Sequence, residues 1–125
     1  MTLPAPWKTL AWLAYLLCWA VVLVAMFIPQ PPVPMTHGSD KIGHLLALFG
    51  VAFSGCFAVL PGLCEKRYWI WTAVAAIALE CLQGALVAER QFSLWDMAAN
   101  LAGVALAGAA WRLVLRRWLV PARAG

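Results

Sequence analysis

Residues 80–103 read ECLQGALVAERQFSLWDMAANLAG, and the rest of the chain is interpreted around this stretch. It places several polar and charged residues within a sequence that is otherwise almost entirely apolar. Ionisable side chains cost roughly 2.5–3.5 kcal/mol each at the centre of a bilayer on insertion scales, and where they occur they tend to mark function. We therefore interpret the stretch as a polar site shared by two transmembrane helices and by the short loop that joins them.

The composition of the chain is that of a membrane protein. Of its 125 residues, 65% are hydrophobic and 11% are charged, which leaves too little polar surface for a water-soluble domain. A bilayer core of about 30 Å requires about 20 apolar residues in a helix. Four runs reach that length, and none alternates like a barrel strand: residues 9–28, 40–60, 69–88 and 94–115. We predict an all-α polytopic membrane protein, a single domain over residues 1–125 with four transmembrane helices.

The apolar runs are separated by segments that end helices. The proline-rich segment PQPPVP at residues 29–34 follows the first run, and proline lacks the amide donor that would continue a helix. Pro61-Gly62 ends the second run, and we expect Glu65-Lys66-Arg67 to form a short charged turn. Residues 89–93 form the last turn, which leads into the fourth run.

Small residues recur at the four-residue spacing that lets helix backbones approach each other closely in lipid. Gly43 with Ala47 is one such pair, and Gly103 with Ala107 is another. We expect both pairs to lie at close contacts between helices.

The nine Lys and Arg residues fall unequally on the two sides of the membrane. Such residues accumulate near the cytoplasmic ends of spans. Only Lys41 and Arg90 fall on one side of the predicted topology. Seven bases fall on the other: Lys8, Lys66, Arg67, Arg112, Arg116, Arg117 and Arg123. The pattern predicts that both termini are cytoplasmic. Because the bases lie at span ends and not along one face, it also argues against nucleic-acid binding.

With this topology, polar residues from separate stretches meet in the outer half of the membrane. At 1.5 Å per residue, Gln83 and Glu80 lie on the order of 8 and 12 Å below the outer end of the third span. Residues three or four apart share a helix face, as Asp96 and Asn100 do in the fourth span. The candidate site residues are Asp40, Lys41 and His44 in the second span, Glu80 and Gln83 in the third, Arg90 and Ser93 in the turn, and Asp96 and Asn100 in the fourth.

The side-chain chemistry indicates a role for each group. The candidates for handling a proton, and hence for catalysis, are Glu80, His44 and Asp96. Two helix N-termini and two cations favour an anionic group such as a lipid phosphate. The candidate ligand-binding residues are Asp40, Lys41, Gln83, Arg90, Ser93 and Asn100. The mix of Asp, His and Glu suits a divalent metal in ligand type, but the spacing carries no metal-specific signature and identifies no cofactor.

Each of these residues also has a purely structural interpretation. Ser93 and Asp96 have the spacing of a capping box at the start of the fourth span, and Asp40 can cap the second. The two cations can extend to lipid headgroups, and the histidine and asparagine can join helices by hydrogen bonds. Glu80 is the hardest to explain in this way, because no cap accounts for it. Its structural alternative is a tether to that histidine or asparagine.

The polar segments resemble the VanZ-like family of small bacterial membrane proteins. The matching pieces are Asp40-Lys41-Ile-Gly-His44 and Glu80-x-x-Gln83-x6-Arg90-x-x-Ser93-x-x-Asp96-x3-Asn100-x-x-Gly103, which together cover most of residues 40–108. The chain departs from the family at Ala88-Glu89, where a proline or glycine is expected just before the arginine. The resemblance implies a multi-pass protein of the bacterial cytoplasmic (inner) membrane, linked through the family's namesake to resistance against glycopeptide antibiotics, notably teicoplanin.

Together the residues and the resemblance predict an outer-leaflet pocket that binds an anionic membrane lipid or a lipid-linked cell-envelope intermediate, such as a cell-wall precursor. Acid–base chemistry on that ligand is an extension of this hypothesis. One alternative is a small proton-coupled exporter working as a dimer, which requires a polar path to the cytoplasmic side. Another is a structural assembly protein whose polar network only fixes helix packing. A homo-oligomer is compatible with the sequence.

Overall fold

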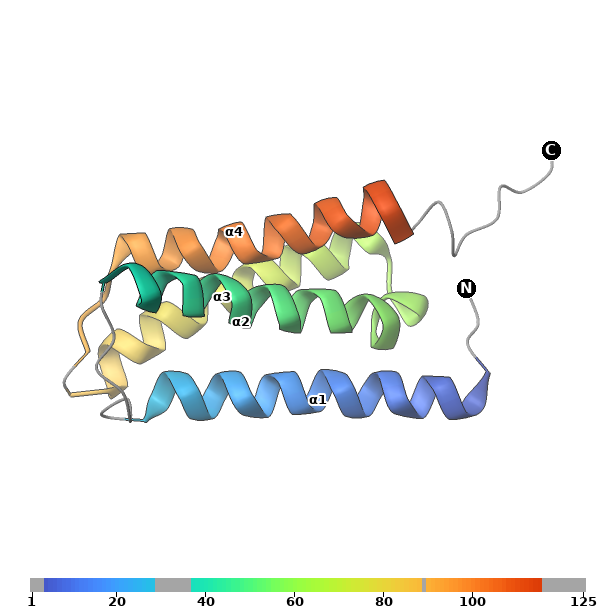
Figure 1. The fold of residues 1–125 in the computed structure, drawn as a ribbon, viewed down its shortest axis with the longest axis horizontal. Helices are drawn as coiled ribbons and strands as arrows, with labels where there is room; N and C mark the ends of the chain where they lie inside the picture. The colour runs from blue at the N-terminus through green and yellow to red at the C-terminus, as the bar shows by residue number, and fades with distance from the viewer. Residues whose placement is uncertain (1–3, 29–36, 89, 116–125) are drawn as a thin grey trace.

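The computed structural model describes residues 4–28, 37–88 and 90–115, which form helices joined by short connections (Figure 1). The α-helices are α1 (Ala5–Phe27), α2 (His37–Ala58), α3 (Glu65–Leu86) and α4 (Leu94–Ala110). A 3-10 helix, η1 (Leu60–Gly62), joins α2 to α3, and a π-helical turn, η2 (Trp111–Leu115), continues α4. The predicted all-α class is confirmed. The prolines of 29–34, Glu89, Arg116, Arg117 and Arg123 lie outside the described residues.

Three helices are long and apolar enough to cross a membrane: α1, residues Asp40–Ala58 of α2, and α3. The fourth helix is not shown to do so. Its 17 residues rise by about 26 Å, which is less than the roughly 30 Å of a bilayer core. The crossing expected over residues 94–115 also needs the π-helical turn η2, and it stays a prediction.

In the bundle α2 lies between α1 and α4, and α3 packs against α4 (Figure 1). The C-terminal ends of α1 and α3 and the N-terminal ends of α2 and α4 gather at one end of the bundle. The core between the helices is apolar and includes Leu48, Val51, Ala76 and Val104. Most large side chains of α1 are exposed, as expected for a helix that faces lipid.

The two glycines predicted at close contacts have different surroundings. A Cβ atom on Gly103 would collide with the Leu45 carbonyl oxygen of α2 and come within 2.9 Å of the Phe49 nitrogen. This confirms the close approach of α4 to α2. A Cβ atom on Gly43 would meet nothing within 4 Å, so the close contact predicted for Gly43 is wrong. The residue instead borders a cavity between α1 and α2.

The two connections at the ends of α3 also differ from expectation. Glu65, Lys66 and Arg67 do not form a turn, because they are the first residues of α3 and the chain reverses in η1. After α3, the chain folds back along the helix, so that a Cβ atom on Gly84 would come within 2.9 Å of the Phe92 nitrogen. Because of this return, α4 begins beside the last turns of α3 and not beyond its end.

Candidate functional site

All of the residues predicted for the site belong to the described part of the chain, and they lie at the end of the bundle where α2 and α4 begin. Their burial differs. Five are buried: His44, Glu80, Gln83, Asp96 and Asn100. The other four are partly exposed: Asp40, Lys41, Arg90 and Ser93. The charged groups nearest to one another are Asp40, Lys41, His44, Arg90 and Asp96, and we call these five residues the polar cluster.

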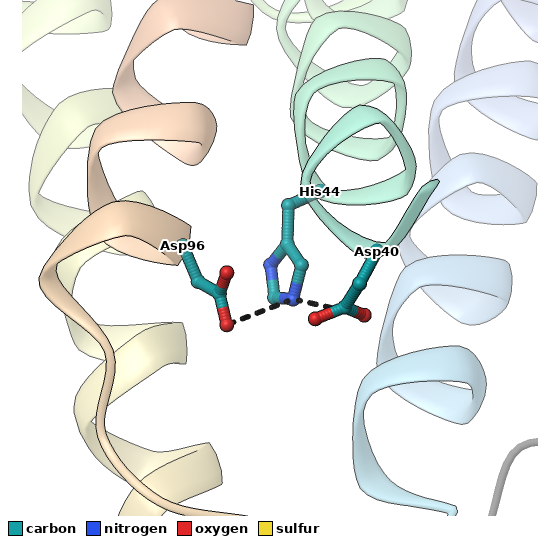
Figure 2. A group of neighbouring side chains, drawn as sticks. All are labelled: Asp40, His44 and Asp96. Carbon is teal, nitrogen blue, oxygen red and sulfur yellow. Dashed lines mark ion pairs between the residues drawn. The ribbon is translucent and has the colours of Figure 1, made fainter. Parts of the chain in front are cut away.

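The centre of the polar cluster is a histidine between two carboxylates (Figure 2). His44 Nε2 lies 3.9 Å from Asp40 Oδ1 and 3.8 Å from Asp96 Oδ2. Asp40 lies one helical turn before His44 on α2, whereas Asp96 comes from the first turn of α4. One ligand atom from each of the three residues lies within 4.8 Å of the other two. This is a donor set that can hold a metal ion.

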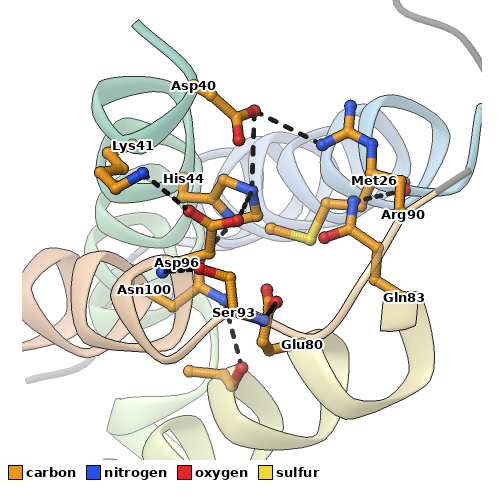
Figure 3. Close-up of polar contacts among 11 residues, drawn as sticks. Met26, Asp40, Lys41, His44, Glu80, Gln83, Arg90, Ser93, Asp96 and Asn100 are labelled. Atoms are coloured by element: carbon orange, nitrogen blue, oxygen red, sulfur yellow. Dashed lines mark hydrogen bonds and ion pairs between the residues drawn. The ribbon is translucent and has the colours of Figure 1, made fainter. Parts of the chain in front are cut away.

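The orientation of the His44 ring is fixed by the hydrogen bond of its Nδ1 atom. Asn100 Nδ2 donates a hydrogen bond to the Ala76 carbonyl oxygen at 3.3 Å, which leaves Asn100 Oδ1 as an acceptor. That oxygen lies 3.0 Å from His44 Nδ1 (Figure 3), so Nδ1 carries a proton and donates it. In the neutral ring, therefore, the lone pair is on Nε2 and faces the two carboxylates.

The two cations predicted to hold an anion are each paired with a carboxylate. Arg90 Nη1 lies 3.4 Å from Asp40 Oδ1, and Lys41 Nζ lies 3.7 Å from Asp96 Oδ1. The polar cluster thus holds two carboxylates and two cations, and their charges balance when His44 is neutral. An anionic ligand therefore meets cations whose charge is already balanced.

Glu80 has a structural partner that was not expected. Its Oε1 accepts a hydrogen bond from the Ser93 backbone N–H at 3.0 Å, and Ser93 Oγ accepts one from the Asp96 N–H at 3.3 Å. The predicted Ser93 cap is confirmed, but Glu80 takes the acceptor role that a capping box would give to Asp96. Asp96 is thereby left to face α2. The expected tether of Glu80 to the histidine or asparagine is replaced by this bond, and Glu80 Oε2 is buried without a hydrogen bond among the described residues.

Gln83 connects the site to the first helix. Its Nε2 donates a hydrogen bond of 2.7 Å to the Met26 carbonyl oxygen, near the end of α1 (Figure 3). Beside this bond lies a cavity of about 520 Å³ between α1, α2 and the end of α3, which we call the groove. Its charged and polar lining is Asp40, His44, Gln83 and Arg90, and the rest of its lining is apolar.

The groove was missed by sequence reasoning. The first span had been interpreted only as an apolar anchor, yet it supplies much of the wall, including Ala20, Val21, Val24 and Ala25. The available signal was Gly43, which was interpreted as a point of close helix contact. A glycine allows two helices to pack closely, but where they do not pack closely, as at Gly43, its missing side chain leaves a cavity.

Comparison of the chain with protein-family models, with curated proteins and with solved structures found no match. The resemblance to the VanZ-like family stays a prediction that rests on the residues of 40–108 alone. The function must therefore be argued from the site.

Proposed function

We propose that the chain binds an anionic lipid, or a lipid-linked cell-envelope intermediate, in the groove between α1 and α2. The observation that carries this proposal is the division of the groove into two parts. It is apolar along the helices and charged at the end where α2 begins. An amphiphile has the same division, with a headgroup at one end of an apolar chain.

The groove is accessible to such a ligand from the side. Val21 and Val24 line it, and they are also 59% and 60% exposed on the surface of the bundle. A lipid chain can therefore enter from the surrounding bilayer without crossing the core. Arg90 lies at the charged end, where its guanidinium can form paired hydrogen bonds to phosphate or carboxylate oxygens. His44 reaches both the groove and the polar cluster, so it is the best candidate to exchange a proton with a bound headgroup.

The position of the bases supports a cytoplasmic location for both termini. Lys66 and Arg67 begin α3, and Arg112 pairs with Glu65 there, with its Nε 3.2 Å from the carboxylate. Lys8 lies near the start of α1 at the same end of the bundle (Figure 1). Apart from the two cations of the polar cluster, the described bases thus lie opposite the site. By the positive-inside rule, the site faces the outer side of the membrane.

Four crossings are favoured over three by the position of the last helix. The pair of Arg112 with Glu65 brings the end of α4 and η2 beside the first turn of α3. Residues 94–115 therefore run back along α3, which is long enough to span a membrane on its own. We propose a bacterial cytoplasmic membrane protein with four crossings, as the family resemblance also implies.

The exporter alternative is less well supported. An exporter needs polar groups along a path through the bundle. Between the polar cluster and the opposite end, the core among the described residues is mainly apolar and includes Leu48, Val51, Ala52, Ala76 and Val104. The buried hydroxyl groups of Tyr68 and Thr72 both donate hydrogen bonds to backbone carbonyl oxygens. A protein that handles a ligand at one membrane face requires no such path. Glycopeptide antibiotics act at the outer surface on cell-wall precursors, so a precursor bound there would also connect the protein to resistance.

The proposal can be tested by identifying lipids that purify with the protein, using mass spectrometry of the extracted complex. Gly43→Leu should fill the groove, since nothing lies within 4 Å of the added Cβ. Arg90→Ala should remove the cation at the headgroup end. We expect Arg90→Ala to lower the amount of the bound amphiphile by about tenfold, because a charge-assisted hydrogen bond contributes roughly 1.5–3 kcal/mol. Gly43→Leu should lower it because the new side chain occupies the space of the ligand.

Two matched controls separate binding from general effects. Ala78→Leu introduces the same side chain at an exposed position of α3, and Arg112→Ala removes an arginine at the opposite end of the bundle. Both controls should retain the amphiphile of the unaltered protein. A lipid profile that is the same in all four variants would refute a specific ligand in the groove.

A further inference from the structure

We propose that Asp40, His44 and Asp96 bind a divalent transition-metal cation at the charged end of the groove. The three donors come from two helices that are held together tightly by the contact at Gly103. A site that bridges α2 and α4 in this way is positioned by the packing of the bundle and not by a loop.

The histidine is oriented as a metal ligand. Its Nδ1 donates to Asn100 Oδ1, and Asn100 is itself held by the Ala76 carbonyl oxygen. Metal-bound histidines generally donate their other N–H to an oxygen in this manner, which fixes the ring and directs the free lone pair at the metal. His44 Nε2 is directed between the two carboxylates (Figure 2).

The surroundings of that lone pair call for a positive charge. His44 is 5% exposed and Asp96 is 9% exposed, so water screens them little. Asp96 Oδ1 is buried and has no hydrogen bond among the described residues, although Lys41 lies 3.7 Å from it. A lone pair facing two carboxylates at less than 4 Å is unfavourable, and either a proton on Nε2 or a metal cation between the three groups relieves the repulsion.

The donor set also indicates the class of cation. One imidazole nitrogen with two carboxylate oxygens suits Mn²⁺, Fe²⁺ or Zn²⁺ better than Mg²⁺ or Ca²⁺, which prefer oxygen ligands alone. Two ligands about 2.1 Å from a tetrahedral metal are about 3.4 Å apart. The observed distances of 3.8 and 3.9 Å are slightly longer, and a small rotation of each carboxylate closes the difference.

A bound divalent cation would give the otherwise balanced polar cluster an excess of positive charge. With three protein ligands, coordination positions stay open for a headgroup oxygen. The excess positive charge favours phosphate. This last step rests on the proposed function, whereas metal binding itself can be measured with no amphiphile present.

The test uses Mn²⁺ alone with the full-length protein in detergent, and electron paramagnetic resonance to measure free Mn²⁺. Mn²⁺ is chosen because it binds thiols weakly, so the exposed Cys64 and Cys81 do not interfere. We expect one saturable site per chain, weakened at least about tenfold by His44→Gln, since this change removes one of the three donors. Asp40→Asn should also weaken it, and Glu65→Gln, at the opposite end of the bundle, should not.

The outcomes separate the two proposals. Absence of a Mn²⁺ site, or an unchanged site in both His44→Gln and Asp40→Asn, would overturn the metal proposal. If the His44→Gln variant does not fold, the Mn²⁺ affinity of Asp40→Asn tests the metal proposal. The Asp40 side chain is 27% exposed, so replacing it perturbs the core less. A retained amphiphile without metal binding would leave the proposed function standing alone. Metal binding without any amphiphile would support the metal site and remove the proposed lipid ligand.

Discussion

The contact between α2 and α4 at Gly103 leads to a quantitative prediction about stability. A Cβ atom there meets backbone atoms of Leu45 and Phe49, which cannot rotate away as a flexible side chain can. Overpacking of this kind costs typically 1–3 kcal/mol. Replacing a helical glycine by alanine also gains about 1 kcal/mol of helix propensity. We therefore expect Gly103→Ala to lower the free energy of unfolding by up to about 2 kcal/mol.

The same substitution at two other helical glycines supplies the control. Nothing lies within 4 Å of a Cβ at Gly43, and the Trp69 ring lies at an ordinary contact distance of 3.7 Å from one at Gly108. Both variants should keep most of the propensity gain, up to about 1 kcal/mol. This gain is common to all three glycines, so Gly43→Ala and Gly103→Ala should differ by the overpacking cost of about 1–3 kcal/mol. Unfolding by sodium dodecyl sulfate in mixed micelles measures these differences. Equal stability of the Gly43 and Gly103 variants would refute the close backbone contact.

Two further predictions concern the ends of α3. The free energy of unfolding of Glu80→Gln should lie within about 0.5 kcal/mol of that of the unaltered protein, because the new amide oxygen can still accept from the Ser93 N–H. Glu80→Leu should lower it by about 1–3 kcal/mol, and equal losses for the two variants in denaturant titrations would contradict this role. At the other end, the N–H groups of Arg67 and then Lys66 lower the pKa of the exposed Cys64 thiol. More thiolate is then present at any given pH, so maleimide should react with Cys64 at a lower pH than with an ordinary thiol of pKa about 8.5, as measured against Cys64→Ser. If this end is cytoplasmic, a membrane-impermeant maleimide should label Cys64 only after the cells are opened.

The positions of the helices could be predicted because their signals are local. α1 ends at Phe27, just before the first proline of the 29–34 segment, and α2 ends at Ala58, just before Pro61-Gly62. Asp96 and Asn100 are both buried at the site, as their four-residue spacing on one helix predicts. Hydrophobic length and helix-breaking residues determine such features without reference to the rest of the chain.

Contacts between helices could not be predicted in the same way. Gly43 and Gly103 have equivalent small-residue patterns, but one faces the groove and the other faces a backbone, and only the arrangement of neighbouring helices distinguishes them. The partner of Glu80 was missed for a related reason. Its depth was predicted from a span that ends at residue 88, which says nothing of where the following turn lies. Phe92 instead lies against Gly84, and Ser93 reaches Glu80.

The polar residues fall into two groups, and this division bears on the alternative that they serve packing alone. Asn100, Gln83 and Glu80 each form a hydrogen bond with the backbone of a neighbouring segment, so a structural role is sufficient to explain them.

Packing does not explain the second group. The Nε2 atom of His44 lies 3.9 Å from Asp40 and 3.8 Å from Asp96, distances that are too long for hydrogen bonds, and the lone pair of a neutral ring repels both carboxylates. Buried charges of this kind often stabilise a fold less than apolar residues of similar volume would. A bundle that needed only helix association would be better served by apolar side chains at these positions. A ligand that brings positive charge between the two carboxylates accounts for this arrangement. The groove that Asp40 and His44 line explains why these groups lie at this end of the bundle.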